Sequence, residues 1–401
     1  VDILYFPEDN KPTPPHPKTR KIEFFEVDGT PSKRYLTQKP SLHLDVSTKG
    51  NFEHYMLKEI YEQPELILKM ANYYFEGEGK NKLSSFAQKN IENIIITACG
   101  TAWHAGLLFK YYVPHFSKTR TQIELASEFR YQKYFFKENE IGLMISQSGE
   151  TADTLACQEL CHAHHIDTYS IINVEGSTIF RNAKENFPIL AGAEIGVAST
   201  KAFTLQSLTG LLMAQALGGN KNNEVLHKEF ILLAQKMKNF FTLIASVKEV
   251  VQKVCHAKGF IFTGRGQFYP IALEGALKLK EIAYVHAEGY AAGELKHGPI
   301  ALIDDTFVNI ALVGHDLFDK TVSNIEEVKA RKGIMLIVGP KDNERLKNLS
   351  DHYIGVDMEG LTFTAPLMAN LVMQCFAYEI AKQKGTDIDQ PRNLAKSVTV
   401  E

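Results

Sequence analysis

Short apolar runs alternate with helix-like stretches along most of this chain, and the alternation limits the possible folds more than any other feature. In the first half, strand-like runs fall at 94–97, 122–125, 142–145, 169–174 and 189–190. In the second half they fall at 259–266, 284–286, 308–313, 335–338 and 353–356. Because parallel strands are joined by crossovers that usually contain a helix, this order is typical of doubly wound parallel sheets. The sequence therefore predicts an α/β protein with two such sheets, each in a three-layer αβα arrangement.

The second half repeats the pattern of the first. Residues 259–266 resemble 94–100, since each is an apolar strand that ends in a glycine turn. A repeat longer than a hundred residues indicates a duplicated domain and not a solenoid. We predict an N-terminal segment at 1–41 with a hairpin at 21–36, domains at 42–223 and 224–384, and a tail at 385–401.

The composition excludes some classes of protein and disfavours others. With a net charge of −3, the chain lacks the general positive field of a nucleic-acid-binding protein. Five cysteines are scattered through apolar segments, as reduced thiols are in a cytoplasmic protein. No apolar run is long enough to span a bilayer and no signal peptide is present, so we expect no membrane partner. Cys157 and Cys161 share a helical face, which suits a metal poorly without further ligands.

A turn of small polar residues separates the strand at 142–145 from a helix predicted at 152–163. The first N–H groups of a helix have no partner within it, and the helix dipole adds positive charge there, so this is a place for an anion. Ser146, Ser148 and Thr151 add hydroxyl donors, and Gly149 lets a ligand approach the backbone. No Lys or Arg lies in the turn, so its donors suit a phosphate monoester. The same residues could simply cap the helix, and the turn alone leaves both interpretations open.

Five longer motifs identify a family resemblance. They are ACGTAWHAG from Ala98, SQSGETADTL from Ser146, AEIGVASTKAF from Ala193, GRGQFYPIALEGALKLKEIAYVHAEGYAAGELKHGP from Gly264 and DQPRNLAKSVTVE from Asp389. From about residue 42 to its end, the chain resembles the isomerase part of the glutamine–fructose-6-phosphate aminotransferase family, also called glucosamine-6-phosphate synthases. That part has two sugar isomerase (SIS) domains and a catalytic C-terminal tail. In the family a glutaminase domain precedes it, and residues 1–41 resemble only the end of that domain, so we expect no glutaminase activity in this chain.

The resemblance implies a set of contacts to fructose 6-phosphate. The matching residues are Thr101, Ser146, Gln147, Ser148, Thr151, Val197 and Ser199. After Thr101, relatives usually have a serine where this chain has Ala102, which puts one hydroxyl contact in doubt.

The resemblance also implies four catalytic residues. Lys396 matches the lysine that forms a Schiff base with the open-chain ketose, and an amine on a closing tail can reach C2. Glu281 matches the base that moves a proton between C1 and C2, and Lys278 lies one helical turn before it. His297 matches the histidine that opens the sugar ring from the neighbouring subunit, which implies a homodimer. No metal or organic cofactor is implied.

Two other functions stay open. A SIS-family sugar-phosphate deglycase or deaminase would act on an aminated sugar without any glutaminase, although the hairpin at 21–36 argues against it. A non-catalytic sugar-phosphate sensor would keep the Ser146–Thr151 turn but would not need Glu281 or Lys396. On composition alone the polar tail at 385–401 would be interpreted as a frayed end. Whether the tail is docked on the fold therefore decides between a frayed end and a catalytic tail.

Overall fold

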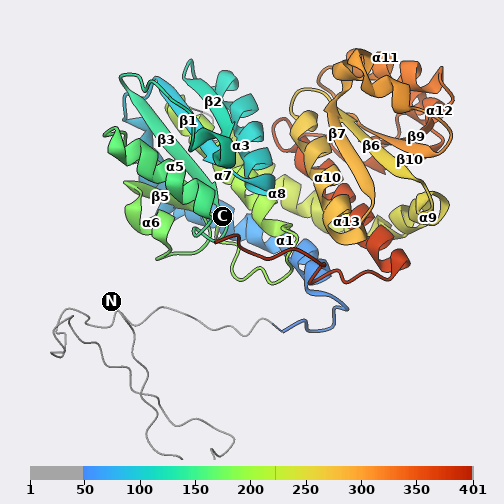
Figure 1. The fold of residues 1–401 in the computed structure, drawn as a ribbon, viewed down its shortest axis with the longest axis horizontal. Helices are drawn as coiled ribbons and strands as arrows, with labels where there is room; N and C mark the ends of the chain where they lie inside the picture. Colours follow the sequence, from blue (N-terminus) through green and yellow to red (C-terminus); the bar gives the residue numbers. More distant parts are fainter. Residues whose placement is uncertain (1–47, 222, 400–401) are drawn as a thin grey trace, which may run out of the picture. The chain divides into compact units, whose positions relative to one another are not determined.

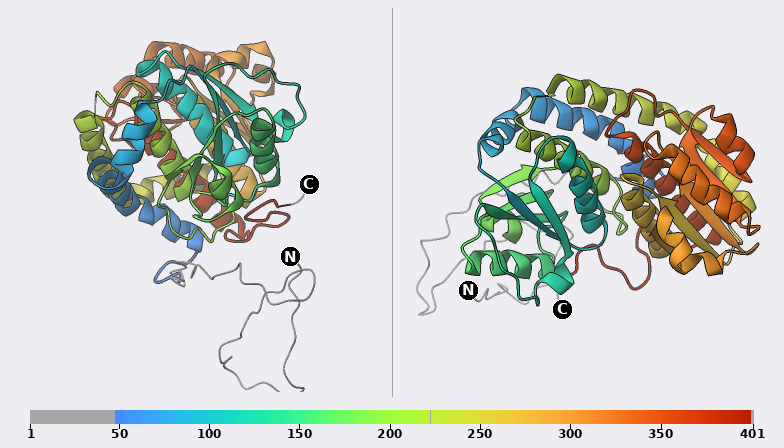
Figure 2. Two further views of the ribbon diagram at one scale, coloured as in Figure 1. Left: turned by 90° about the vertical axis from the view of Figure 1, so that its left-hand side faces the viewer. Right: turned by 90° about the horizontal axis from the view of Figure 1, so that it is seen from above.

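The computed structural model describes residues 48–221 and 223–399, and residues 49–401 form one compact unit. The hairpin predicted at 21–36 and the segment 1–41 lie outside the described residues. Two five-stranded parallel sheets form the centre of the described part, and helices cover both faces of each (Figure 1; Figure 2). This confirms the predicted fold class.

The first sheet has the strand order β2-β1-β3-β4-β5, and all its strand pairs are parallel. Its strands are β1 (Asn93–Ala98), β2 (Arg120–Leu125), β3 (Glu140–Ser146), β4 (Thr168–Ile172) and β5 (Glu185–Pro188). The helices of this half are α1 (Tyr55–Ala71), α2 (Gly79–Ala87), α3 (Gly100–Tyr112), α4 (Ala126–Phe129), α5 (Ala152–Ala163), α6 (Thr178–Asn182) and α7 (Lys201–Leu217), with short turns η1 (Asn72–Glu76) and η2 (Val113–His115).

The second sheet has the order β10-β9-β8-β6-β7, which is the first sheet's order read from its other edge. Its strands are β6 (Gly259–Gly264), β7 (His286–Ala291), β8 (Phe307–Leu312), β9 (Ile334–Pro340) and β10 (His352–Val356). The helices are α8 (Asn223–Phe240), α9 (Ile244–Val254), α10 (Phe268–Ala283), α11 (Phe318–Lys329), α12 (Glu344–Leu349) and α13 (Ala365–Lys384), with 3-10 turns η3 (Phe241–Leu243), η4 (Ala292–His297) and η5 (Pro299–Leu302). The shared order supports the duplication that the sequence indicated.

Two strand predictions were misplaced. The run at 189–190 follows β5 instead of forming it, because β5 is a short edge strand whose first half is polar and gives no apolar signal. The run at 284–286 begins too early, since Tyr284 ends α10 with a left-handed φ of 54° and β7 starts at His286.

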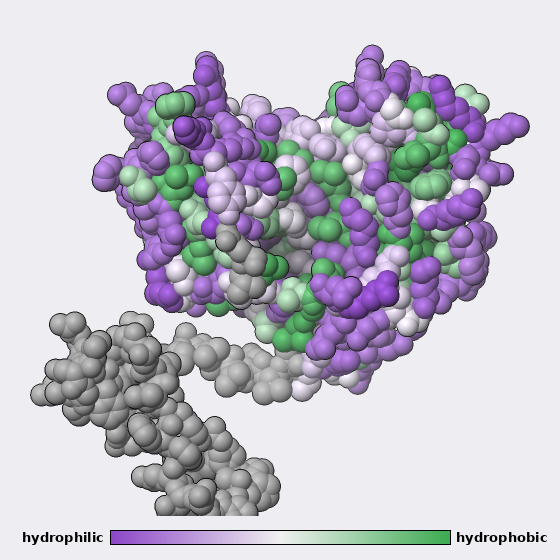
Figure 3. Space-filling model, in the orientation of Figure 1, coloured by the Kyte–Doolittle hydropathy of each residue, from purple (hydrophilic) through white to green (hydrophobic). Residues whose placement is uncertain are grey.

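Helices α7 and α13 are buried along almost their whole length. A helix that is apolar on all sides lies inside the fold, and one continuous core joins α7 to α13 across both halves. Figure 3 shows one outer face, on which hydrophilic side chains predominate along the edges and apolar ones lie in separate patches between them.

The helical stretch Asn223–Val254 is long and apolar enough to cross a membrane by length and composition alone. The structure divides this stretch at η3 into α8 and α9. The inward faces, which include Phe230 and Val251, belong to the core. A core helix of a folded domain passes the same length and composition test, so the stretch is weak evidence for a membrane span.

Candidate active site

From the strand order of the first sheet, a ligand is expected to bind at the carboxyl ends of β1 and β3. In an order of this type the connections from these two strands leave in opposite directions, and ligands bind where they diverge. Thr101 lies just after β1, and Ser146 is the last residue of β3. The two predicted binding segments therefore lie at one edge of the sheet.

The turn after β3 has a conformation that its glycine makes possible. Gly149 has a φ of +68°, and a Cβ atom there would lie 2.0 Å from the hydroxyl oxygen of Ser177. The backbone N–H of Gly149 donates to Ser146 Oγ at 2.9 Å, and the next N–H donates to Ser148 Oγ at 3.2 Å. Because a hydroxyl that accepts these bonds keeps its own hydrogen, both serines can still donate to a ligand. Thr151 precedes α5 and makes no side-chain capping bond, so helix capping does not explain the turn.

The loop between β5 and α7 carries the other predicted sugar contacts. Val197 and Ser199 are half-buried in it, as Gln147 is in the turn after β3. The N–H of Val197 donates to the carbonyl of Asp389 at 3.0 Å, so the loop contacts the C-terminal tail.

The tail places Lys396 against a carboxylate that sequence reasoning missed. Lys396 Nζ donates to Glu194 Oε2 at 2.5 Å and to the carbonyl of Gly196 at 2.8 Å. Glu194 Oε1 also accepts the N–H groups of Thr200 and Ala202. Burial opposes the charge on Glu194, but the Lys396 ammonium and these N–H groups outweigh it and hold the pKa of the carboxyl below its ordinary value. Glu194 lies within the AEIGVASTKAF motif, but no sequence signal pairs it with a lysine about two hundred residues away.

The tail is docked on the fold and is not a frayed end. The carboxylate of Asp389 accepts the N–H groups of Tyr55 and Met56, at 2.9 and 3.0 Å, at the start of α1. Ser397 Oγ donates to Ser148 Oγ at 3.1 Å, directly beside Lys396. The tail therefore contacts both the loop that binds the predicted Schiff-base amine and, through Ser397, the predicted phosphate turn.

A buried polar network joins α3 of the first half to α10 of the second. Glu274, which is fully buried, accepts bonds from Thr101 Oγ1 at 3.0 Å and contacts His104 Nδ1 at 2.7 Å. Lys278 Nζ lies 3.4 Å from Glu274 Oε1 and donates to Thr101 Oγ1 at 3.1 Å. Burial opposes ionisation of Glu274, but Lys278, His104 and Thr101 together hold the pKa of this carboxyl below its ordinary value. Neither His104 nor this role of Thr101 was predicted from the sequence.

Lys278 also contacts the predicted proton-transfer base. Its Nζ lies 2.5 Å from Glu281 Oε2, and the lysine side chain is 1% exposed against 21% for the glutamate. Burial acts against the charge of Lys278, but Glu274 and Glu281 outweigh it and raise the pKa of the amine above its ordinary value. The two side chains are in direct contact, and an effect of Lys278 on the chemistry of Glu281 stays a prediction.

His297 stands apart from these residues in this chain. It ends the turn η4 and is exposed. Among the described residues, the structure joins it to neither Lys396 nor Glu281 by a hydrogen bond or ion pair. This arrangement agrees with a histidine that acts on another copy of the chain, which stays a prediction.

Two other features of the chain lack the chemistry of a binding site. Cys157 and Cys161 are buried, and burial raises the pKa of each thiol to about 12, which disfavours the thiolate that a metal requires.

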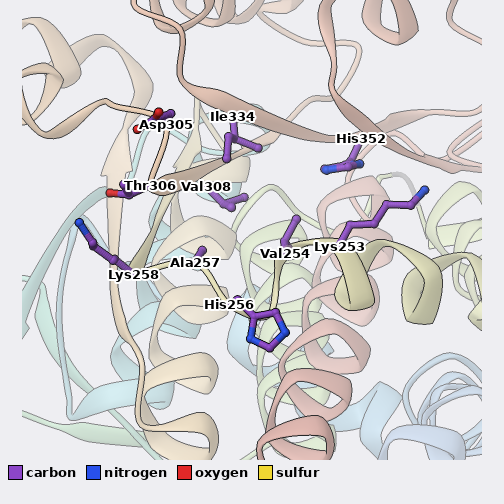
Figure 4. A pocket seen from close by; sticks show the side chains of 10 residues that line it. All are labelled: Lys253, Val254, His256, Ala257, Lys258, Asp305, Thr306, Val308, Ile334 and His352. Atoms are coloured by element: carbon purple, nitrogen blue, oxygen red, sulfur yellow. The ribbon is translucent and has the colours of Figure 1, made fainter.

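A hollow of about 320 Å³ opens at the amino ends of the second sheet's strands (Figure 4). The Lys253 and Lys258 side chains point away from each other there, so the charges do not converge on one ligand.

Comparison with known proteins agrees with this architecture. The family described as "SIS domain" matches residues 86–216 and 253–381. A glutamine–fructose-6-phosphate aminotransferase [isomerizing] of Brucella abortus is 41% identical over 390 residues, and one of Shewanella oneidensis is 42% identical over 399 residues. These matches cover 95% of this chain and 64% of each relative, so the chain spans less than two thirds of their length.

A solved structure is similar over nearly the whole described part. It is the C-terminal domain of glucosamine-fructose-6-phosphate aminotransferase from Francisella tularensis, at 36% identity and a TM-score of 0.79, with 86% of this chain and 100% of that one covered. A glucosamine-6-phosphate deaminase from Thermotoga maritima, at 22% identity and a TM-score of 0.69, shares the fold. The chain belongs to the SIS-domain family and, within it, to the isomerase part of the glutamine–fructose-6-phosphate aminotransferases.

Proposed function

We propose that this chain binds fructose 6-phosphate and converts it through an imine at Lys396. The observation that carries the proposal is the docked tail, in which Ser397 contacts Ser148 of the phosphate turn while the preceding residue, Lys396, binds Glu194. A phosphate held by this turn would leave the opposite end of an open-chain sugar near the amine. The relatives named above support this choice of substrate.

In the proposed reaction each residue has one task. Lys396, once it has given up a proton, attacks the C2 carbonyl of the open-chain sugar, and water leaves as the imine forms. Ammonia then displaces the lysine from C2, or water hydrolyses the imine, so that the amine is released before a proton reaches C2. Glu281 removes a proton from C1 and returns it to C2, with Lys278 beside it. With ammonia from a glutaminase domain the product is glucosamine 6-phosphate, and without ammonia it is glucose 6-phosphate. We further propose a cytoplasmic homodimer in which His297 opens the ring at the neighbouring site.

The direct test is turnover by the purified chain. Fructose 6-phosphate should yield glucose 6-phosphate, and unphosphorylated fructose should not react. Binding without turnover would indicate a sensor. Release of ammonia from glucosamine 6-phosphate, without ketose–aldose isomerisation, would indicate a deglycase.

Replacing Ser148 with alanine should weaken binding of fructose 6-phosphate by about 1–3 kcal/mol, because a hydrogen bond to a charged group is lost. Calorimetry should show almost no change for fructose itself. An equal loss for both sugars would contradict the phosphate assignment.

Replacing His297 with alanine should slow turnover of the cyclic sugar far more than that of an open-chain analogue. Mixing His297→Ala chains with Lys396→Ala chains should restore about one working site per dimer if the histidine acts across the interface. Failure to recover any activity would place the whole site within one chain.

A further inference from the structure

A glutamate on α1 holds the loop to which Lys396 binds. Glu59 is 2% exposed, and its Oε1 accepts the N–H groups of Ile195 and Gly196 at 2.5 and 3.1 Å. The carbonyl of the same Gly196 accepts a bond from Lys396 Nζ at 2.8 Å. One residue of the loop therefore connects the glutamate to the lysine.

The second carboxylate oxygen of Glu59 has no hydrogen-bond partner among the described residues, although it is buried. A Cβ atom on Gly196 would lie only 3.0 Å from it, so the loop packs closely on the carboxyl group. A buried, unpartnered oxygen is costly for a charged carboxylate and much less so for a protonated one.

The charges around Glu59 act in the same direction. Burial, and then the negative charge of Glu194, raise the pKa of Glu59 to about 8, while the two N–H groups and Lys396 act against this rise. On its own helix, Glu62 lies 3.5 Å from Lys58 and 2.8 Å from Lys201 of α7, so that carboxylate has cations of its own. Asp389 is the other charged residue of the tail that contacts α1, and its carboxylate accepts backbone N–H groups at the start of that helix.

We propose that Glu59 is a positioning residue for imine formation. Glu59 forms a buried carboxyl pair with Glu194, and this pair holds the amine of Lys396 and exchanges a proton with it. The inference rests on the proposed function and adds a residue to it. When Glu59 is protonated, Glu194 is the single negative charge of the pair. When Glu59 ionises, a second negative charge favours the ammonium form of Lys396, which cannot attack the sugar.

The experiment compares the parent chain with Glu59→Gln and with a control, Glu62→Gln, one turn along α1. Glutamine keeps an oxygen for the two loop N–H groups but cannot ionise. Two readouts are followed from pH 6.5 to pH 9: acylation of Lys396 by acetic anhydride without sugar, measured by mass spectrometry, and borohydride trapping of the fructose 6-phosphate adduct.

For both readouts, the extent of modification of Lys396 in Glu59→Gln is divided by that in the parent. This ratio should rise from about one at pH 6.5 to about threefold or more at pH 9, as expected when one nearby charge is removed. The KM for fructose 6-phosphate should change little, and Glu62→Gln should follow the parent. An acylation ratio that stays constant with pH, or one that Glu62→Gln reproduces, overturns the inference. If acylation changes as expected but the parent forms no adduct, the carboxyl pair stands and the proposed imine chemistry falls.

Discussion

Replacing Lys396 with arginine should abolish both the borohydride-trapped adduct and isomerisation, with a fall in kcat of at least about a thousandfold if the imine carries the reaction. Arginine keeps the positive charge and can still pair with Glu194, so the tail should stay docked. It cannot form the imine at neutral pH. The loss would therefore report on covalent chemistry and not on folding.

Lys382→Arg is the matched control. Lys382 is an exposed lysine that pairs with Glu53, and its replacement should leave both adduct and rate unchanged. Peptide mapping should place the parent's adduct on Lys396 and not on Lys278, whose side chain is 1% exposed. If Lys396→Arg isomerises at close to the parent rate, the imine is wrong and Glu281 must act through an enediol without covalent help.

The sequence predicted the sheets well because their central strands are continuous apolar runs, as strands buried on both faces must be. The helix predicted at 152–163 matches α5 residue for residue. Edge strand β5 was missed because it is half polar, and β7 was misplaced because α10 ends in a left-handed tyrosine. Such details depend on neighbours in space and not on local periodicity.

In the candidate site, too, local features could be predicted from the sequence and features that depend on distant residues could not. The turn after β3 could be recognised because its hydroxyls and glycine are consecutive. Glu194, Glu59 and His104 could not, because each acts through a partner more than a hundred residues away. Arg392, four residues before Lys396, has its guanidinium over the ring of Tyr284 at 4.4 Å, another contact that no local pattern indicates.

Replacing Glu274 with leucine should destabilise the protein by about 3–5 kcal/mol, measured by urea unfolding, because it leaves the buried charge of Lys278 without its fully buried carboxylate partner. Glu274 and Lys278 are 0% and 1% exposed, and the change also removes the acceptor for His104 and Thr101. The chain offers a matched control in Glu249 and Lys253, a glutamate–lysine pair at the same helical spacing that is 69% and 51% exposed. Glu249→Leu should leave the unfolding midpoint almost unchanged, since exposed pairs contribute little.

The pKa shifts of Glu274 and Lys278 determine how the difference in unfolding free energy between the parent and Glu274→Leu depends on pH. The pKa of Glu274 is lowered in the fold, so its contribution to stability is present above the ordinary carboxyl value of 4.5 and is lost as the pH falls through the folded value. The pKa of Lys278 is raised, so its contribution is present below the ordinary value of 10.5 and is lost only as the pH rises through the higher folded value. The gap in unfolding free energy between the parent and Glu274→Leu should therefore stay constant between these two ordinary values and narrow in acid. A gap no larger than that of Glu249→Leu would mean that water reaches the pair and that α3 and α10 are not joined by a buried network.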